Sequence, residues 1–156
     1  MSEFSLELSE EQEQLRDWVH QFSVDVVRPA AAEWDEREEF PYPIVQQAAE
    51  IGLYSWEFLA QGMLGDKTGL TMPVAIEELF WGDAGIGMAI MGSALAAAGI
   101  AASGTQEQVM EWVPQCYGDA TDLKLGRSAP ANPTPAPTSA ATGRGPSTTR
   151  PPTSGC

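Results

Sequence analysis

The sequence is poor in cysteine, histidine and basic residues. It has two cysteines, one histidine and eight Lys or Arg residues against 22 Asp and Glu, so its 156 residues carry a formal net charge of −14. Cys116 and Cys156 are too few and too far apart for a disulfide framework or a metal-ligand spacing, so we expect no metal site and a reducing, cytoplasmic location. The negative charge repels nucleic-acid phosphates and anionic lipids, which predicts no nucleic-acid partner.

Long apolar runs and a signal peptide are also missing. The most apolar run, 86–102, holds no charge but is rich in Gly and Ala. It falls short of the ~20 residues that cross a bilayer, so it predicts a buried helix and no membrane span. The segment from Met1 to Leu8 is acidic and has neither the basic start nor the apolar stretch of a secretory signal.

A first helix is predicted from its start signal and its apolar spacing. Ser9 followed by Gln12 forms a capping box, which marks a helix N-terminus. Apolar residues then recur at helical spacing: Leu15, Val19, Phe22 and Val26. Pro29 predicts that this helix ends or kinks near Arg28, because proline lacks the amide donor that a helix needs.

Four further helices are predicted over residues 43–51, 71–81, 88–102 and 106–117. Gly52 is placed to cap the first of them with a positive φ, and Pro114 to end or kink the last. A glycine-containing loop is expected over 55–67. The residues expected to face inward are Ile44, Ala48, Ile51, Val74, Ile76, Leu79, Phe80, Val109, Trp112 and Val113. Five helices without a convincing strand predict the all-α fold class.

The end of the chain has a different composition. Residues 127–156 contain no Val, Ile, Leu, Met, Phe, Trp or Tyr, and 28 of these 30 residues are Arg, Ser, Ala, Pro, Thr or Gly. They carry a charge of +3, against −17 for residues 1–126. Without apolar surface to offset the entropy of ordering, they predict a disordered low-complexity tail after a helical domain. Within the tail, Pro133, Pro135 and Pro137 would suit a linker or a proline-reading partner.

Several short segments of the helical domain stand out by their order and spacing. They are Phe40-Pro41, Ile51-Gly52-Leu53, Ile76-Glu77-Glu78-Leu79, the small-residue run before Gly104, Gly104-Thr105-Gln106-Glu107-Gln108 and Trp112-Val113-Pro114. Taken together they resemble the N-terminal domain of acyl-CoA dehydrogenases. The resemblance covers about Leu6 to Gly126, and the Gly104–Gln108 segment with its flanking helices is its most specific part.

The resemblance implies a three-domain enzyme, with a helical domain, a β domain and a helical bundle. Such enzymes use FAD to oxidise the α–β bond of an acyl-CoA thioester. A glutamate takes the α-proton, the flavin accepts the β-hydride, and an electron-transferring flavoprotein receives the electrons. In the usual family pattern, residues 123–126 lead into Thr-Glu-Pro and Gly-Ser-Asp motifs, whereas here they lead into Arg127-Ser128-Ala129-Pro130. We therefore expect a fragment without catalytic or cofactor-binding residues, which binds no FAD and is inactive by itself.

The change in composition after Gly126 is abrupt. The residue types that follow are those that GC-rich codons give in a wrong frame, so we hypothesise that the tail is an out-of-frame translation. A genuine short protein with an added tail is the alternative. The other two reading frames of the gene decide between them, because the hypothesis requires the missing family motifs in one of those frames.

Three residues of the predicted helix 88–102 match the face that lines the acyl-chain pocket in the family. They are Met88, Met91 and Leu95, spaced three and four apart. Methionine suits a flexible apolar pocket, because its side chain adapts its shape. The alternative, which helical spacing alone favours, is that all three pack in the core.

Other residues that could carry chemistry favour structural roles. His20 has no Cys or second His near it in the sequence, so it predicts a surface or half-buried residue rather than a base or ligand. Glu77 and Glu78 point about 100° apart on a helix, so we expect one to pack against a basic group and the other to face water. The three glycines of 82–87 follow no strand and so do not form a dinucleotide fingerprint.

A rival interpretation is a small acidic helical interaction module with a proline-rich tail. It predicts a stable monomer with a sharp thermal transition. The fragment instead predicts an exposed apolar face, where the other domains pack in relatives, and hence self-association.

Overall fold

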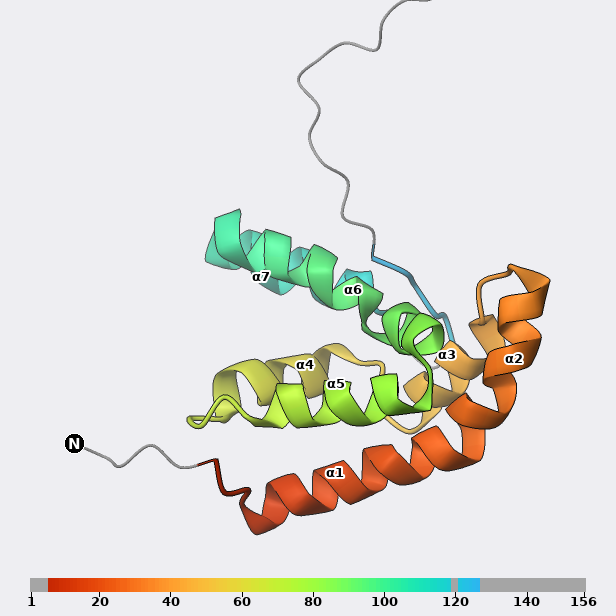
Figure 1. Cartoon of the computed structure of the whole chain (residues 1–156). Helices are drawn as coiled ribbons and strands as arrows, with labels where there is room; N and C mark the ends of the chain where they lie inside the picture. Colours follow the sequence, from red (N-terminus) through yellow and green to blue (C-terminus); the bar gives the residue numbers. More distant parts are fainter. Residues whose placement is uncertain (1–5, 119–120, 127–156) are drawn as a thin grey trace, which may run out of the picture.

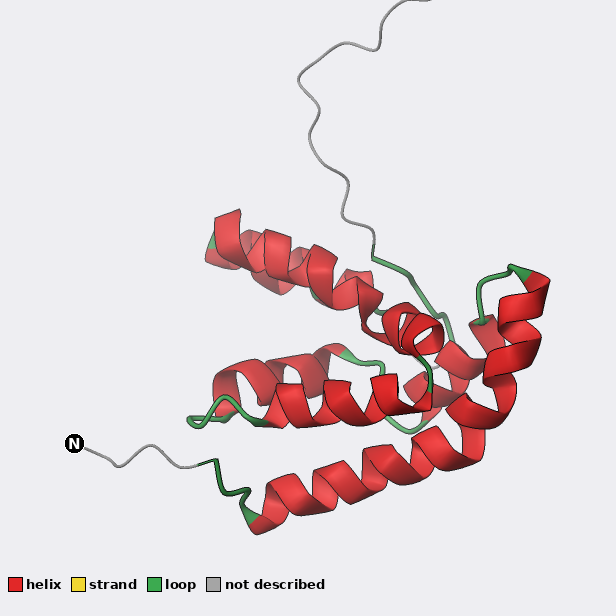
Figure 2. Ribbon diagram, viewed as in Figure 1, coloured by secondary structure: helices red, strands yellow, loops and turns green. Residues whose placement is uncertain are grey.

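A computed structural model of the chain describes residues 6–118 and 121–126. The described residues contain α-helices, short π and 3₁₀ turns, and one isolated β-bridge between Gly118 and Leu123, but no strand (Figure 2). The helices are α1 (Glu10–Phe22), α2 (Arg28–Arg37), α3 (Tyr42–Glu50), α4 (Trp56–Ala60), α5 (Thr71–Gly82), α6 (Ala84–Ser103) and α7 (Gln106–Trp112). The all-α prediction is therefore confirmed. The predicted disordered tail, 127–156, lies outside the described residues.

The start of α1 follows the predicted capping box. The Gln12 amide N–H donates to Ser9 Oγ at 3.3 Å, and the Ser9 N–H donates back to Gln12 Oε1 at 3.0 Å. After α1 the chain passes through a π-helical turn, η1 (Ser23–Val27), into α2, which holds Pro29 in its first turn. The continuous helical segment α1–η1–α2 bends at this point (Figure 1). Proline removes one backbone hydrogen bond, and the π-helical turn accommodates its loss. The kink is as predicted, and the helical segment continues to Arg37.

The core lies where α1, α5 and α6 stack in successive layers, and α7 packs on the far side of α6 from α5 (Figure 1). Val19 of α1 and Leu79 of α5 are fully buried where those two helices meet, and α3 packs against α6 with Val45 and Ala48 fully buried. The capping role of Gly52 is confirmed, since its φ is +83°.

Three residues predicted to face inward are exposed instead. The exposed fractions are 42% for Ile51, 36% for Ile76 and 49% for Trp112. On α5, Ala75 and Leu79 form the buried line of contact, and Ile76 lies one residue further round the helix. The small side chain of Ala75 lets the neighbouring helices approach. The size of a side chain therefore did not predict which residues of α5 face the core.

The segment 55–67 was predicted as a loop, and this was wrong. It holds α4 and a second π-helical turn, η2 (Gln61–Gly65). Ser55 caps α4 by accepting the Phe58 N–H at 3.1 Å. Gly62, which suggested a loop, is in contact with the side chain of Met72, so its lack of a Cβ serves close packing rather than a turn.

Helix α6 begins four residues before the predicted start. Asp83 has an extended backbone and caps the helix, its Oδ1 accepting the Ile86 N–H at 2.8 Å. At 20 residues, α6 is long and apolar enough to cross a membrane by length and composition, so the length argument made from the sequence was wrong. The core helix of a soluble protein can have the same length and composition. Helix α6 packs against α5, α7 and α3, with Ile86 and Ile90 in the core.

Candidate functional site

The outer face of α6 carries a line of uncharged residues that the core does not cover. Met88 is 49% exposed and Leu95 is 60% exposed. A Cβ added at Gly92 or Gly99 would meet nothing within 4 Å. These four residues fall within one face of the helix at spacings of three and four, and we call them the α6 stripe. The stripe offers apolar surface that a thin molecule or another backbone can approach closely.

The three predicted pocket residues are divided between this stripe and the core. Met88 and Leu95 share the stripe, whereas Met91 lies at its edge, half-buried and packed against the core. The alternative that all three are core residues is therefore wrong for Met88 and Leu95. Their contact with an acyl chain stays a prediction.

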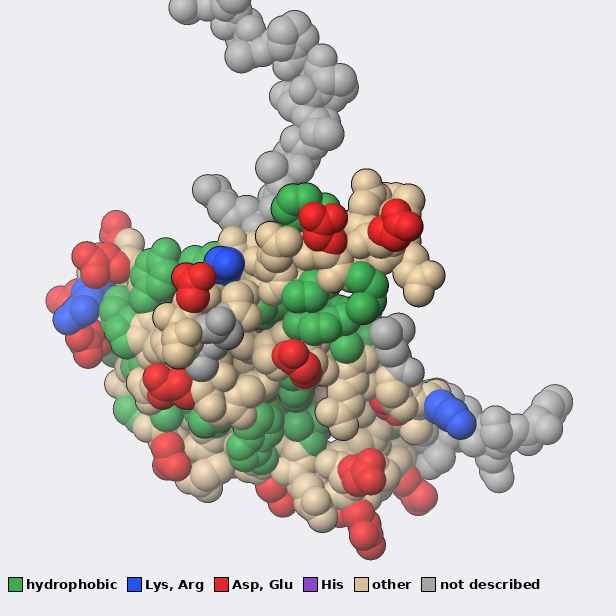
Figure 3. Space-filling model, turned by 180° about the vertical axis from the view of Figure 1, so that it is seen from behind, with side chains coloured by type: hydrophobic (Ala, Val, Ile, Leu, Met, Phe, Trp, Pro, Cys, Tyr) green, Lys and Arg blue, Asp and Glu red, His purple; other side chains and the backbone are tan. Residues whose placement is uncertain are grey.

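Two further exposed apolar side chains lie on α7, which packs against α6. Met110 is 64% exposed and Trp112 is 49% exposed. Figure 3 shows, on the face opposite to that of Figure 1, apolar patches among many acidic side chains and few basic ones. An exposed apolar surface was expected from the sequence and is present, while self-association through it stays a prediction.

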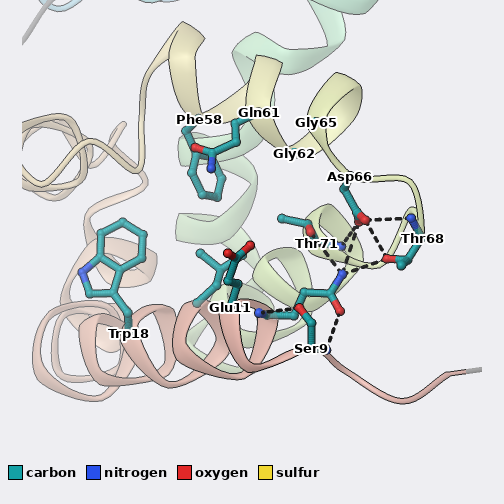
Figure 4. A pocket seen from close by; sticks show the side chains of 12 residues that line it. Ser9, Glu11, Trp18, Phe58, Gln61, Gly62, Gly65, Asp66, Thr68 and Thr71 are labelled. Carbon is teal, nitrogen blue, oxygen red and sulfur yellow. Dashed lines mark hydrogen bonds between the residues drawn. The ribbon is translucent and has the colours of Figure 1, made fainter.

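A concave region lies elsewhere, between the start of α1, the α4–η2 segment and the loop before α5 (Figure 4). It is a half-open cleft of about 510 Å³. Trp18 and Phe58 line one end of it, with ring centroids 6.4 Å apart, and Glu11 and Gln61 extend into it. This cleft was not predictable from the sequence, because its walls come from segments about 50 residues apart.

A polar cluster closes the other end of this cleft. The Gln12 side-chain amide, on a residue only 5% exposed, donates to Thr68 Oγ1 at 2.8 Å, to Thr71 Oγ1 at 3.3 Å and to Asp66 Oδ2 at 3.4 Å. Asp66 also accepts the Thr68 hydroxyl and amide, each at 2.7 Å, and the Thr71 amide at 2.8 Å. These donors, the Thr68 hydroxyl first and the Thr71 amide next, hold the pKa of Asp66 well below its usual range.

The lining of this cleft does not suit a flavin dinucleotide. The cleft is lined by the carboxylates of Glu11 and Asp66 and by no basic side chain, so it repels phosphate groups. Gly82, at the end of α5, and Gly87, near the start of α6, are used for packing, since a Cβ at Gly82 would lie 2.9 Å from Val27 Cγ1 and one at Gly87 would lie 2.9 Å from Phe80 Cδ2. They leave no room for a phosphate cradle.

His20 has the structural surroundings that were predicted for it. Its Nδ1 lies 2.7 Å from Glu78 Oε2, its side chain is 42% exposed, and its ring lies 4.5 Å from that of Trp81. Arg28 covers Trp81 at 4.4 Å from the ring centroid. Glu77 is exposed, so the prediction that one glutamate packs against a basic group and the other faces water is confirmed. Within residues 6–118 and 121–126, no three His, Cys, Asp or Glu side chains are grouped to hold a metal ion.

Comparison with known proteins agrees with the helical architecture. Residues 9–118 match the family model described as "Acyl-CoA dehydrogenase, N-terminal domain". The chain is 32% identical over 111 residues to a probable medium-chain specific acyl-CoA dehydrogenase 2, mitochondrial, of Caenorhabditis briggsae. The aligned residues are 71% of the chain and 27% of that relative.

Two bacterial relatives show the same relation. A short-chain specific acyl-CoA dehydrogenase of Clostridium acetobutylicum is 35% identical over 117 residues, which are 72% of the chain and 30% of the relative. The (2S)-methylsuccinyl-CoA dehydrogenase of Cereibacter sphaeroides is 34% identical over 113 residues, which are 69% of the chain and 20% of the relative. The chain thus spans less than a third of the length of each of these relatives. Because the family model covers most of the chain, including every α-helix of the described residues, the chain belongs to the acyl-CoA dehydrogenase family through its N-terminal domain.

Proposed function

We propose that this domain forms one wall of the acyl-chain pocket in a flavin-dependent acyl-CoA dehydrogenase, an enzyme that oxidises the α–β bond of an acyl-CoA thioester in fatty-acid oxidation. The supporting observation is the α6 stripe, in which Met88 and Leu95 are exposed beside the open positions Gly92 and Gly99. An aliphatic chain has no polar group to satisfy, so an uncharged surface is the surface it needs.

The stripe favours an acyl chain over a polar ligand on energetic grounds. Fully covering a Met or Leu side chain with apolar atoms gains about 1.5–3 kcal/mol, and Met88 and Leu95 are each about half available for such a gain. Gly92, between them, lets the acyl chain lie against the helix backbone, where dispersion contacts are closest. Met91, at the edge of the stripe, would adapt its side chain to the chain's shape.

The remaining parts of the reaction belong, in this proposal, to regions other than the described residues. Those regions would hold FAD, which would supply the hydride acceptor, and would supply the base for the α-proton. An electron-transferring flavoprotein is the expected acceptor of the electrons, and acyl-CoA is the expected substrate. By itself the 156-residue chain is expected to be inactive.

Methyl NMR on the purified chain tests whether the α6 stripe contacts an acyl chain. We expect titration with a medium-chain acyl-CoA to shift the methyl signals of Met88 and Leu95, whereas free CoA shifts neither. Met63, an exposed methionine on η2, is the matched internal control, and Leu95→Glu should abolish the shift at Met88. Equal shifts at Met63 and Met88, or none at the stripe, would exclude the α6 stripe as an acyl-chain wall.

The same preparations test the expected inactivity. The purified chain should show no visible flavin absorbance and should not reduce an electron-acceptor dye when acyl-CoA is added. Tightly bound flavin together with dye reduction would contradict this part of the proposal and leave the stripe test unaffected.

A further inference from the structure

The segment after the β-bridge returns to the middle of α6. Lys124 N–H donates to the Tyr117 carbonyl oxygen at 3.0 Å, and the Gly126 N–H donates to Ser93 Oγ at 2.9 Å. Gly126 lies so close that an added Cβ would be 2.9 Å from Cys116 Cβ and 3.1 Å from Ala96 Cβ. The segment Leu123–Gly126 is therefore in direct contact with α6.

Two buried hydroxyl groups join this segment to the core. Tyr54 and Ser93 are each 3% exposed. The Tyr54 hydroxyl contacts Ser93 Oγ and donates to the Lys124 carbonyl oxygen. Because the Tyr54 proton goes to that carbonyl, Ser93 must donate its own proton to Tyr54 and accept one from Gly126.

The bonds then form one chain with a consistent direction. It runs from the Gly126 N–H to Ser93, from Ser93 to Tyr54, and from Tyr54 to the Lys124 carbonyl, so it begins and ends on the same segment. Burial raises the pKa of Tyr54 further above the usual tyrosine value, so its hydroxyl stays protonated and able to donate. The Tyr54 ring is held edge-on against Tyr117 at 5.0 Å between centroids.

We propose that Tyr54 and Ser93 form a hydroxyl latch that sets the position of Leu123–Gly126 on α6. Leu123 and Leu125 also pack against the core, but apolar contacts tolerate small shifts along a helix, whereas two directed bonds to Lys124 and Gly126 select one register. If the α6 stripe forms the acyl-chain wall proposed above, the latch also positions Leu123–Gly126 relative to that wall. Ser93 lies on α6 between Met91 and Leu95, so the latch fixes the position of Gly126 relative to the α6 stripe.

Amide hydrogen exchange in the 156-residue chain, measured by NMR, tests the latch. In the unaltered protein the Lys124 and Gly126 amides should be protected. Tyr54→Phe keeps the ring and removes the hydroxyl, and Ser93→Ala removes the other. Each should speed exchange at both amides by about fivefold to tenfold, the loss expected for one hydrogen bond, while the amides of Val19 and Leu79 keep their rates.

Matched controls separate the latch from general destabilisation. Tyr42→Phe and Ser103→Ala remove the same hydroxyl groups from exposed sites and should leave Lys124 and Gly126 unchanged. In the double variant Tyr54→Phe with Ser93→Ala, the second substitution should add little, because both act on one chain of bonds.

The latch is overturned if Gly126 is unprotected in the unaltered protein, if the single variants speed all amides equally, or if their effects simply multiply. The experiment uses no acyl-CoA, so its failure leaves the proposal for the α6 stripe standing, and the reverse also holds.

Discussion

At the scale of single residues, Asp66 is a carboxylate on which several donors converge. Its two oxygens accept hydrogen bonds from the Thr68 amide and hydroxyl, the Thr71 amide and the Gln12 side chain. The pKa of Asp66 is well below its usual range, because these donors favour the ionised form. A depressed pKa means that the folded protein gains stability from this group at pH values above its unfolded pKa, and loses it as the pH falls toward the folded value.

We therefore predict that Asp66→Asn lowers the unfolding temperature most at neutral pH. The difference from the unaltered protein should shrink as the pH falls from about 4, the usual value of an aspartate, toward the lower folded pKa. Thermal unfolding at several pH values measures it. Asp35→Asn, at an exposed aspartate of α2, is the control and should change little at any pH. A pH-independent difference at Asp66 would show that the carboxylate's charge is not what holds the cluster.

At the scale of one element, α6 contains glycines with opposite roles. Gly87 faces Phe80 so closely that a Cβ would lie 2.9 Å from the ring, whereas Gly92 has open space above it. Alanine favours a helix over glycine by roughly 0.5–1 kcal/mol, and overfilling a packed contact costs about 1–3 kcal/mol. At Gly87 the cost of overfilling is larger than the helix preference, so alanine should lower the free energy of unfolding. At Gly92 only the helix preference acts, so alanine should raise it.

We predict that Gly92→Ala stabilises the domain and Gly87→Ala destabilises it. Both substitutions are in the same helix and change the same atoms, so each is the control for the other. Urea unfolding should show a higher midpoint for the first variant, by about 0.5–1 kcal/mol in free energy, and a lower midpoint for the second. If both midpoints move in the same direction, the packing of α6 against Phe80 is not as described.

At the scale of the whole molecule, apolar attraction and charge repulsion oppose each other. Met88, Leu95 and Trp112 expose apolar surface on α6 and α7, while the chain carries a net charge of −14. Salt shortens the range of the repulsion, to about 10 Å at 0.1 M ionic strength, and leaves apolar contact intact. Association between copies should therefore depend on salt.

We predict that the chain self-associates more strongly as the salt concentration rises. Sedimentation equilibrium across a salt series measures it, with Leu95→Glu as the variant that should remain monomeric. Leu6→Glu, which changes an exposed leucine ahead of α1, is the matched control and should associate like the unaltered chain. A monomer with a sharp thermal transition at every salt concentration would instead favour an interaction module.

Local features of the fold were predictable where the cause lies within a few residues. The capping box at Ser9 is an example, since it joins groups three residues apart. The positive φ of Gly52 and the interruption at Pro114 are further ones. The cluster around Asp66 was not predictable, because Gln12 reaches it across more than 50 residues of sequence. The Asp-x-Thr spacing of Asp66 and Thr68 marks the local turn but says nothing of Gln12.

The amino-acid sequence alone determined the all-α class, the starts of α1, α5 and α7, the acidic charge and the resemblance to the acyl-CoA dehydrogenase N-terminal domain. Those properties depend on residue type and short spacing. Only the tertiary structure decided which side of α6 is buried, because that helix is apolar or small nearly all round and its pattern does not distinguish one face from the other. Neighbouring helices cover Ile86 and Ile90 and leave Met88 and Leu95 open, and this choice creates the α6 stripe.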